Sequence, residues 1–179
     1  MATALVIVDF QNDFTPGGAL AVAGGDRIAG RIDALSRSGE FDLVVATRDW
    51  HPPDHRSFAA QGGPWPVHCV QGTPGAEFHP ALDRSLLDAV VDTGYTPELE
   101  GYSGFEATTL EALLREHHVD HVTIVGLATD YCVKHTALDA VGLGFETELV
   151  ADGVRPVELE PGDGQRAIDE MTAAGVALA

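Results

Sequence analysis

The chain has very little positive charge. Only 10 of its 179 residues are lysine or arginine, against 28 aspartates and glutamates, so the formal net charge is −18. Lys134 is the only lysine. A surface of this sign repels phosphate backbones and anionic lipid headgroups, which argues against nucleic acids and membranes as partners. Adaptation to salt and a bias in coding composition would explain the acidic excess equally well.

Cysteine and long hydrophobic runs are also scarce. Cys69 and Cys132 are the only cysteines. The first residues include no basic region and only a short apolar run, unlike an export signal, and no stretch approaches the length that spans a membrane. We therefore expect a cytoplasmic protein with two free thiols, because a reducing compartment disfavours a disulfide.

The sequence does contain a repeated alternation of apolar runs and helical segments. Hydrophobic residues make up 45% of a chain that is long enough for a full core, and we expect residues 1–179 to form a single domain. Apolar runs predict strands at residues 4–8, 43–46, 89–92, 122–125, 146–151 and, at an edge, 176–178. Helical spacing predicts helices at residues 26–37, 107–117 and 164–174, and another around Cys132. This order predicts a three-layer α/β/α fold with a six-stranded, mostly parallel sheet.

Cys132 is the candidate nucleophile. Gly126 is predicted to end the apolar strand 122–125, and Val133 and Ala137 then begin a pattern with helical spacing. Cys132 is thus expected in the first turn of a helix, where unpaired N–H groups and the helix dipole lower a thiol pKa and favour the thiolate. A buried structural cysteine is the alternative. We favour the nucleophile because a core cysteine does not require a strand-to-helix junction.

Aspartates follow other predicted strands. Asp9 ends the first strand, Asp49 follows the second, and Asp92 ends the third. In open parallel sheets, ligands bind at the carboxyl ends of the strands. We therefore expect Asp9, Asp49 and Cys132 to meet in one site, although Asp9 taken alone is also compatible with a solvated turn.

The long segment 50–85 predicts a metal site. It is rich in proline, glycine and histidine and has little periodicity, and a loop of that length in a compact domain is usually functional. The motif Asp49-Trp-His51-x3-His55 places one carboxylate and two imidazoles within seven residues, and His68 follows. One aspartate and three histidines suit a single divalent Zn, Fe or Mn ion. Surface histidines beside prolines are the alternative explanation.

Seven stretches together resemble the nicotinamidase and pyrazinamidase group of the isochorismatase-like hydrolases. They are residues 6–14 (VIVDFQNDF), 17–22, 49–55, 65–69, 72–80, 102–106 and 126–132. They occur in family order and cover most of the chain. The resemblance implies a six-stranded parallel sheet flanked by helices. It also implies a metal-containing amidohydrolase of NAD salvage that converts nicotinamide, or aromatic amides such as pyrazinamide, to the acid and ammonia.

The resemblance also implies roles for individual residues. Cys132 would be the nucleophile and Asp9 its general base. The backbone N–H groups of Ala128 and Cys132 would form the oxyanion hole, beside a cis peptide bond after Leu127. The implied metal ligands are Asp49, His51, His55 and His68. The implied substrate-binding residues are Phe14, Trp65, Tyr102, Leu127 and Tyr131, and ordinary aromatic packing is the alternative for the aromatic members.

One position departs from the family pattern. Thr93 stands where the family has a catalytic lysine, which pairs with the aspartate and favours the thiolate. A unit charge about 4 Å away is worth about 4 kcal/mol at a dielectric near 20, or roughly three decades in rate. Neither Lys134 nor Arg48 is expected to project toward the site. Thr93 is therefore either an inactivating difference or part of altered chemistry.

Three functions remain open from the sequence. The chain is a nicotinamide amidohydrolase weakened at Thr93, a catalytically silent relative that still binds the ligand and the metal, or an amidase for another small amide. The expected partner is a small aromatic amide. The sequence leaves both a monomer and a homo-oligomer open.

Overall fold

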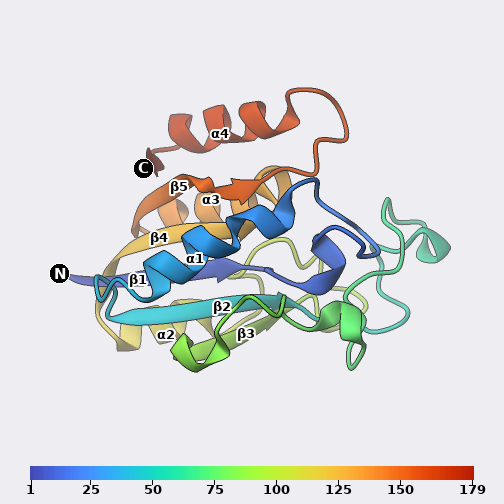
Figure 1. The fold of residues 1–179 in the computed structure, drawn as a ribbon, viewed down its shortest axis with the longest axis horizontal. Helices are drawn as coiled ribbons and strands as arrows, with labels where there is room; N and C mark the ends of the chain where they lie inside the picture. Colours follow the sequence, from blue (N-terminus) through green and yellow to red (C-terminus); the bar gives the residue numbers. More distant parts are fainter.

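A parallel β-sheet forms the centre of the molecule. The computed structural model describes all of residues 1–179, and Figure 1 shows the sheet flanked by helices. The strands are β1 (Ala2–Val8), β2 (Leu43–Asp49), β3 (Ala89–Thr93), β4 (Val119–Leu127), β5 (Glu146–Arg155) and β6 (Ala177–Leu178). They lie in the order β3-β2-β1-β4-β5-β6, and every neighbouring pair is parallel. The predicted six-stranded sheet is confirmed, with β6 at an edge.

Helices cover both faces of the sheet. They are α1 (Ala29–Ser36), α2 (Leu110–Glu116), α3 (Lys134–Gly142) and α4 (Asp163–Ala173). Successive side chains of a strand point to opposite faces, and β1 accordingly sends Leu5 and Ile7 into the core under α1. Its other residues, such as Val6, join the core that includes residues of α2, α3 and α4. The predicted three-layer fold is confirmed.

The strand order reverses at β1, and this reversal determines where a ligand site can form. The chain runs outward from β1 through β2 to β3, then crosses to β4 on the other side and continues to β6. Such a switch point leaves a crevice at the carboxyl ends of β1 and β4. In Figure 1 these ends face the side of the molecule where the long segment 50–85 lies, away from the N-terminus. The predicted convergence at this edge rests on this topology.

Gly126 does not end the fourth strand, contrary to the prediction. It lies within β4, with a φ of 121°. A Cβ at this position would lie 2.0 Å from the Val8 carbonyl oxygen. Glycine is therefore required here for a close approach of β4 to β1 and not as a strand terminator.

Two helices begin later than predicted. The segment predicted as a helix at residues 26–37 opens with a 3₁₀ turn, Gly25–Ile28, before α1. The helix predicted at residues 107–117 begins at Leu110. Ala107 has a φ of 52°, which is outside the helical range and excludes it from α2.

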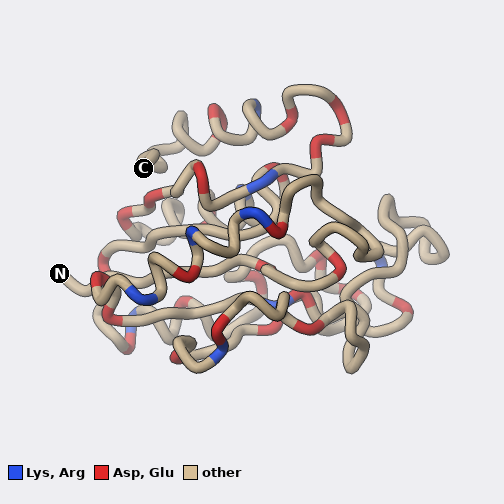
Figure 2. Tube along the Cα trace, in the orientation of Figure 1, with Lys and Arg blue, Asp and Glu red and all other residues tan.

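Acidic residues occur along the whole length of the chain, and basic residues are few (Figure 2). Both cysteines are free, as expected. No helix has the length and apolar character needed to cross a bilayer.

Candidate active site

Cys132 lies at the junction between β4 and α3. It belongs to a π-helical turn, Thr129–Val133, and α3 begins only at Lys134. The peptide bond between Leu127 and Ala128 is cis, as the family resemblance implied. The Ala128 N–H has no hydrogen-bond partner within the protein, and Ala128 and Cys132 line the same pocket. This N–H is thus available to a substrate oxygen.

Asp9 is buried directly after β1, in a left-handed conformation with a φ of 47°. Its Oδ1 accepts a hydrogen bond of 2.7 Å from the Thr47 hydroxyl, and the Cys132 thiol also hydrogen-bonds to it. Burial and the nearby Asp49 carboxylate raise the pKa of Asp9 to about 7, although the two hydrogen bonds oppose this. A carboxylate with this pKa and this contact to the thiol is suited to act as a general base.

The pKa of the Cys132 thiol differs from the prediction. Burial raises the pKa of Cys132 well above its ordinary value, and the negative charges of Asp9 and Asp49 raise it further. The prediction of a lowered pKa was wrong because it considered only the helix end. The tertiary structure adds desolvation and two carboxylates, both of which disfavour the thiolate.

No basic side chain pairs with Asp9. Thr93, where the family resemblance implies a lysine, is buried, and its hydroxyl lies 3.5 Å from Asp49 Oδ1 and 3.4 Å from the Arg48 carbonyl oxygen. Arg48 instead pairs with Asp92 at 2.7 Å, and Lys134 pairs with Glu170 at 3.1 Å. The expectation that neither side chain replaces the lysine is confirmed.

Asp49, His51 and His68 form a buried cluster whose ligand atoms all lie within 4.8 Å of one another. Asp49 Oδ2 is 2.8 Å from His51 Nε2 and 3.3 Å from His68 Nε2. Burial raises the pKa of Asp49, but the two imidazoles more than offset this, and the net pKa is lowered. The carboxylate therefore stays charged, as a metal ligand must.

The far nitrogens of the two imidazoles fix their orientation. His51 Nδ1 lies 2.9 Å from the Gly94 carbonyl oxygen and His68 Nδ1 lies 2.8 Å from that of Pro66. A carbonyl only accepts, so each Nδ1 carries the proton and each Nε2 is directed toward Asp49. This is the arrangement that protein metal sites use to present imidazole ligands. The residues present thus fit a divalent ion.

His55 is not brought into this cluster. Its Nδ1 accepts from the Ser57 backbone N–H at 3.2 Å, and its Nε2 lies 2.7 Å from the Leu99 carbonyl oxygen. Its ring stacks on that of His51, with centroids 3.7 Å apart. Binding a metal would require His55 to release Leu99, so its role as a ligand stays a prediction.

Fourteen residues line a pocket of about 430 Å³, part of it open to solvent, which leads to Cys132. Four of the predicted substrate-binding residues are among them: Phe14, Trp65, Tyr102 and Tyr131. Leu127 is not. It is fully buried and belongs to the core cluster on the α1 side of the sheet. The pocket lining does not support its predicted contact with substrate, which stays a prediction.

Sequence reasoning missed the residues that hold the metal ligands in place. The Gln11 side chain both donates to the Asp49 carbonyl oxygen and accepts from the Asp49 N–H, each at 2.8 Å. Asp13 accepts at 2.8 Å from the N–H of Cys69, next to His68. Both lie in the polar stretch after β1, which was a usable signal. No feature of the sequence pointed to the Gly94 carbonyl, which orients the His51 ring.

Comparison with known proteins identifies the family. The sequence model of the isochorismatase domain matches residues 3–179. The chain belongs to the isochorismatase family. It is 43% identical to a nicotinamidase of Escherichia coli strain K12, over 98% of this chain and 93% of that protein. The predicted resemblance to the nicotinamidase and pyrazinamidase group is confirmed.

Solved structures of this family have the same fold. The pyrazinamidase of Pyrococcus horikoshii, solved in complex with zinc, is 46% identical with a TM-score of 0.90, over 100% of this chain and 99% of that chain. The PnC1 protein of L. infantum, solved in complex with nicotinate, is 38% identical with a TM-score of 0.95, over 99% and 92% of the two chains.

Proposed function

We propose that this protein is a metal-containing cysteine amidohydrolase that converts nicotinamide, and related aromatic amides such as pyrazinamide, to the carboxylic acid and ammonia. The observation that carries the proposal is the meeting of Cys132, Asp9 and the Asp49 cluster beside one aromatic-lined pocket. The named activities of similar proteins support it. We further propose that residues 1–179 act as one catalytic domain.

The proposed chemistry starts with the thiol. Asp9 takes the proton from Cys132, whose sulfur attacks the amide carbon, and the oxyanion that forms accepts from the N–H groups of Ala128 and Cys132. Asp9 then gives the proton to the leaving ammonia. Water, deprotonated by Asp9, hydrolyses the thioester and restores the thiol. Asp49, His51 and His68, with His55 as a further candidate, are the residues that would hold a divalent ion, which there would act as a Lewis acid toward a ring nitrogen or a water.

A catalytically silent relative is the second candidate, and two observations favour it. Asp9 has no basic partner, and the pKa of Cys132 is raised. Both features disfavour the thiolate, so we expect acylation to be slow while the pocket and the metal ligands remain able to bind.

An activity assay separates the two candidates. It measures the release of ammonia and nicotinate from nicotinamide at a high concentration of the metal-reconstituted protein. We expect slow turnover that disappears in Cys132→Ala and persists in Cys69→Ala, with a thioester on the Cys132 peptide detected by mass spectrometry. Equal turnover in Cys132→Ala would contradict the thiol mechanism. Nicotinate binding without any turnover would establish the silent relative.

A further inference from the structure

Tyr102 and Tyr131 form a wall between two hollows. On one side, both line the pocket that leads to Cys132. On the other side, both line a polar surface hollow together with His135 and the Lys134–Glu170 ion pair. His135 does not line the pocket. It therefore lies behind the wall, on the side away from the proposed substrate.

Hydrogen bonding and ring packing hold Tyr102 in place from both sides. The indole N–H of Trp65 donates to the Tyr102 hydroxyl at 2.9 Å, and the Trp65 ring meets the Tyr131 ring edge-on at 4.9 Å between centroids. On the outer side, the His135 ring stacks on Tyr102 with a centroid distance of 5.1 Å and an interplanar angle of 27°. Without His135, the outer face of Tyr102 would border the polar hollow.

We infer that His135 is a positioning residue: its ring holds Tyr102 against the Trp65 indole and thereby keeps the pocket shaped for a flat aromatic ring. The expected effect of His135 on substrate binding rests on the proposed function, whereas its effect on the position of Tyr102 does not. His135 is in the first turn of α3, three residues after Cys132. The nucleophile, Tyr131 and His135 therefore belong to one continuous segment, whereas Tyr102 and Trp65 come from two separate loops.

The surroundings of His135 suit an uncharged stacking partner. Its side chain is half-buried, and burial, with the charge of Lys134, lowers its pKa although Glu100, Asp139 and Glu170 oppose this. A neutral imidazole packs on a tyrosine ring as a small aromatic group does. We therefore expect phenylalanine to replace histidine here and alanine not to.

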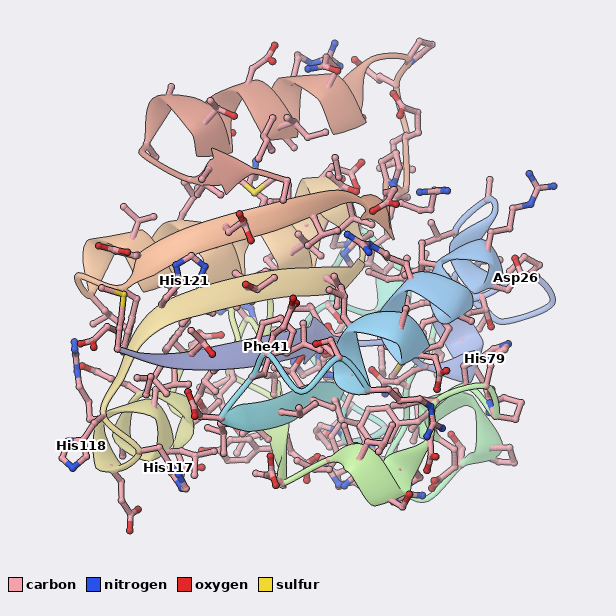
Figure 3. All side chains as sticks on the ribbon, turned by 60° about the vertical axis from the view of Figure 1, so that its left-hand side comes forward. Asp26, Phe41, His79, His117, His118 and His121 are labelled. Carbon is pink, nitrogen blue, oxygen red and sulfur yellow. The ribbon has the colours of Figure 1, made fainter.

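The test compares His135→Ala with His135→Phe, and with His117→Ala as the matched control. His117 is exposed just after α2, and Figure 3 shows it on the opposite side of the molecule from His79. Nicotinate binding to the zinc-loaded protein is measured by calorimetry. We expect His135→Ala to weaken binding roughly 3- to 10-fold, the effect of losing one aromatic pair, with KM raised equally and kcat unchanged. His135→Phe should stay within about twofold of the wild type.

A second readout needs neither substrate nor metal. The chain has two tryptophans, Trp50 and Trp65, so NMR resolves two indole N–H signals, assigned with Trp50→Phe. His135→Ala should shift or broaden the Trp65 signal alone, and His135→Phe should not. An unchanged Trp65 signal in folded His135→Ala would overturn the inference, and so would unchanged nicotinate affinity. A shifted signal in a protein whose wild type neither binds nicotinate nor hydrolyses nicotinamide would support the positioning of Tyr102 and contradict the proposed function.

Discussion

Asp9 and Cys132 are two buried acidic groups in contact, and no lysine or arginine pairs with either. Two groups in this position cannot both carry a negative charge without a large electrostatic penalty. Thr47 donates one hydrogen bond to Asp9, which orients the carboxylate but supplies no net charge. We therefore expect a positive charge introduced at residue 93, where the family resemblance implies a lysine, to shift the balance from thiol toward thiolate.

Thr93→Lys should increase nicotinamide hydrolysis by orders of magnitude. An ammonium group about 4 Å from the two acids would stabilise the thiolate by about 4 kcal/mol at a dielectric near 20, or roughly three decades if the whole effect reached the transition state. The measurement is kcat/KM at equal metal occupancy. Thr93→Met adds similar bulk without the charge and should not activate. A wild-type enzyme of ordinary speed that Thr93→Lys slows would show that threonine is part of a different working mechanism.

The metal ligands give a second prediction for single residues. The reconstituted protein should hold about one divalent ion per chain, as expected for a single site of about four ligands. His51→Ala should lose most of it, because this residue contacts Asp49 most closely and Gly94 fixes its orientation. Elemental analysis after dialysis measures the content, and His117→Ala should keep it. Equal metal in His51→Ala and the wild type would rule out this cluster as the site.

At the scale of elements, the site depends on how β4 leads into the turn that carries Cys132. β4 pairs with β1 from Ala2 to Val8, and the register opposes Val8 to Gly126. The strand then passes through the cis bond and the π turn to α3. Because β1 also ends in Asp9, the pairing of these two strands brings the base and the nucleophile together.

Gly126→Ala should disrupt this pairing. Alanine at a φ of 121° is strained, and its Cβ would lie 2.0 Å from the Val8 carbonyl oxygen, so we expect a loss of at least about 3 kcal/mol in the free energy of unfolding. Urea denaturation followed by circular dichroism measures it. Gly30→Ala in α1, where a Cβ meets nothing within 4 Å, should be neutral or stabilising by up to about 1 kcal/mol. If Gly126→Ala is as stable as Gly30→Ala, β4 does not approach β1 as closely as in this structure.

At the scale of the whole molecule, the net charge of −18 acts on every part of the fold. Figure 2 shows acidic residues throughout the chain, with few basic ones between them. Like charges at this density repel one another and destabilise a compact state. The ion pairs that exist, such as Arg31–Asp152, are mostly on the surface and contribute little individually.

The melting temperature should therefore rise by several degrees when sodium chloride is raised from about 0.01 M to about 0.5 M, because salt shortens the range of the repulsion. Thermal unfolding followed by circular dichroism at neutral pH measures this. Potassium chloride should act equally, since screening depends on ionic strength. Near pH 4.5, the pI of the sequence, the same salt change should have little effect. A fall in melting temperature with salt at neutral pH would contradict a dominant role for repulsion.

Much of this molecule is determined by local sequence. The apolar runs predicted all six strands, because a strand buried on both faces needs continuous hydrophobic residues. The placement of Asp9, Asp49 and Cys132 after strands predicted one composite site, because parallel strands end at the same edge. The motif around His51 was also readable directly, since it depends on residue type and spacing alone.

Other properties were decided only by the tertiary structure, because they depend on residues that are distant in sequence. The pKa of Cys132 is raised by burial and by Asp9, more than 120 positions earlier, whereas the local signal of a helix end predicted the opposite. His55 is held by the Leu99 carbonyl, which no spacing rule relates to it. Leu127 packs in the core because of the face that its strand presents there. Local patterns specify which elements form and which chemical groups they carry; burial and long-range contacts then set the charge, orientation and neighbours of those groups.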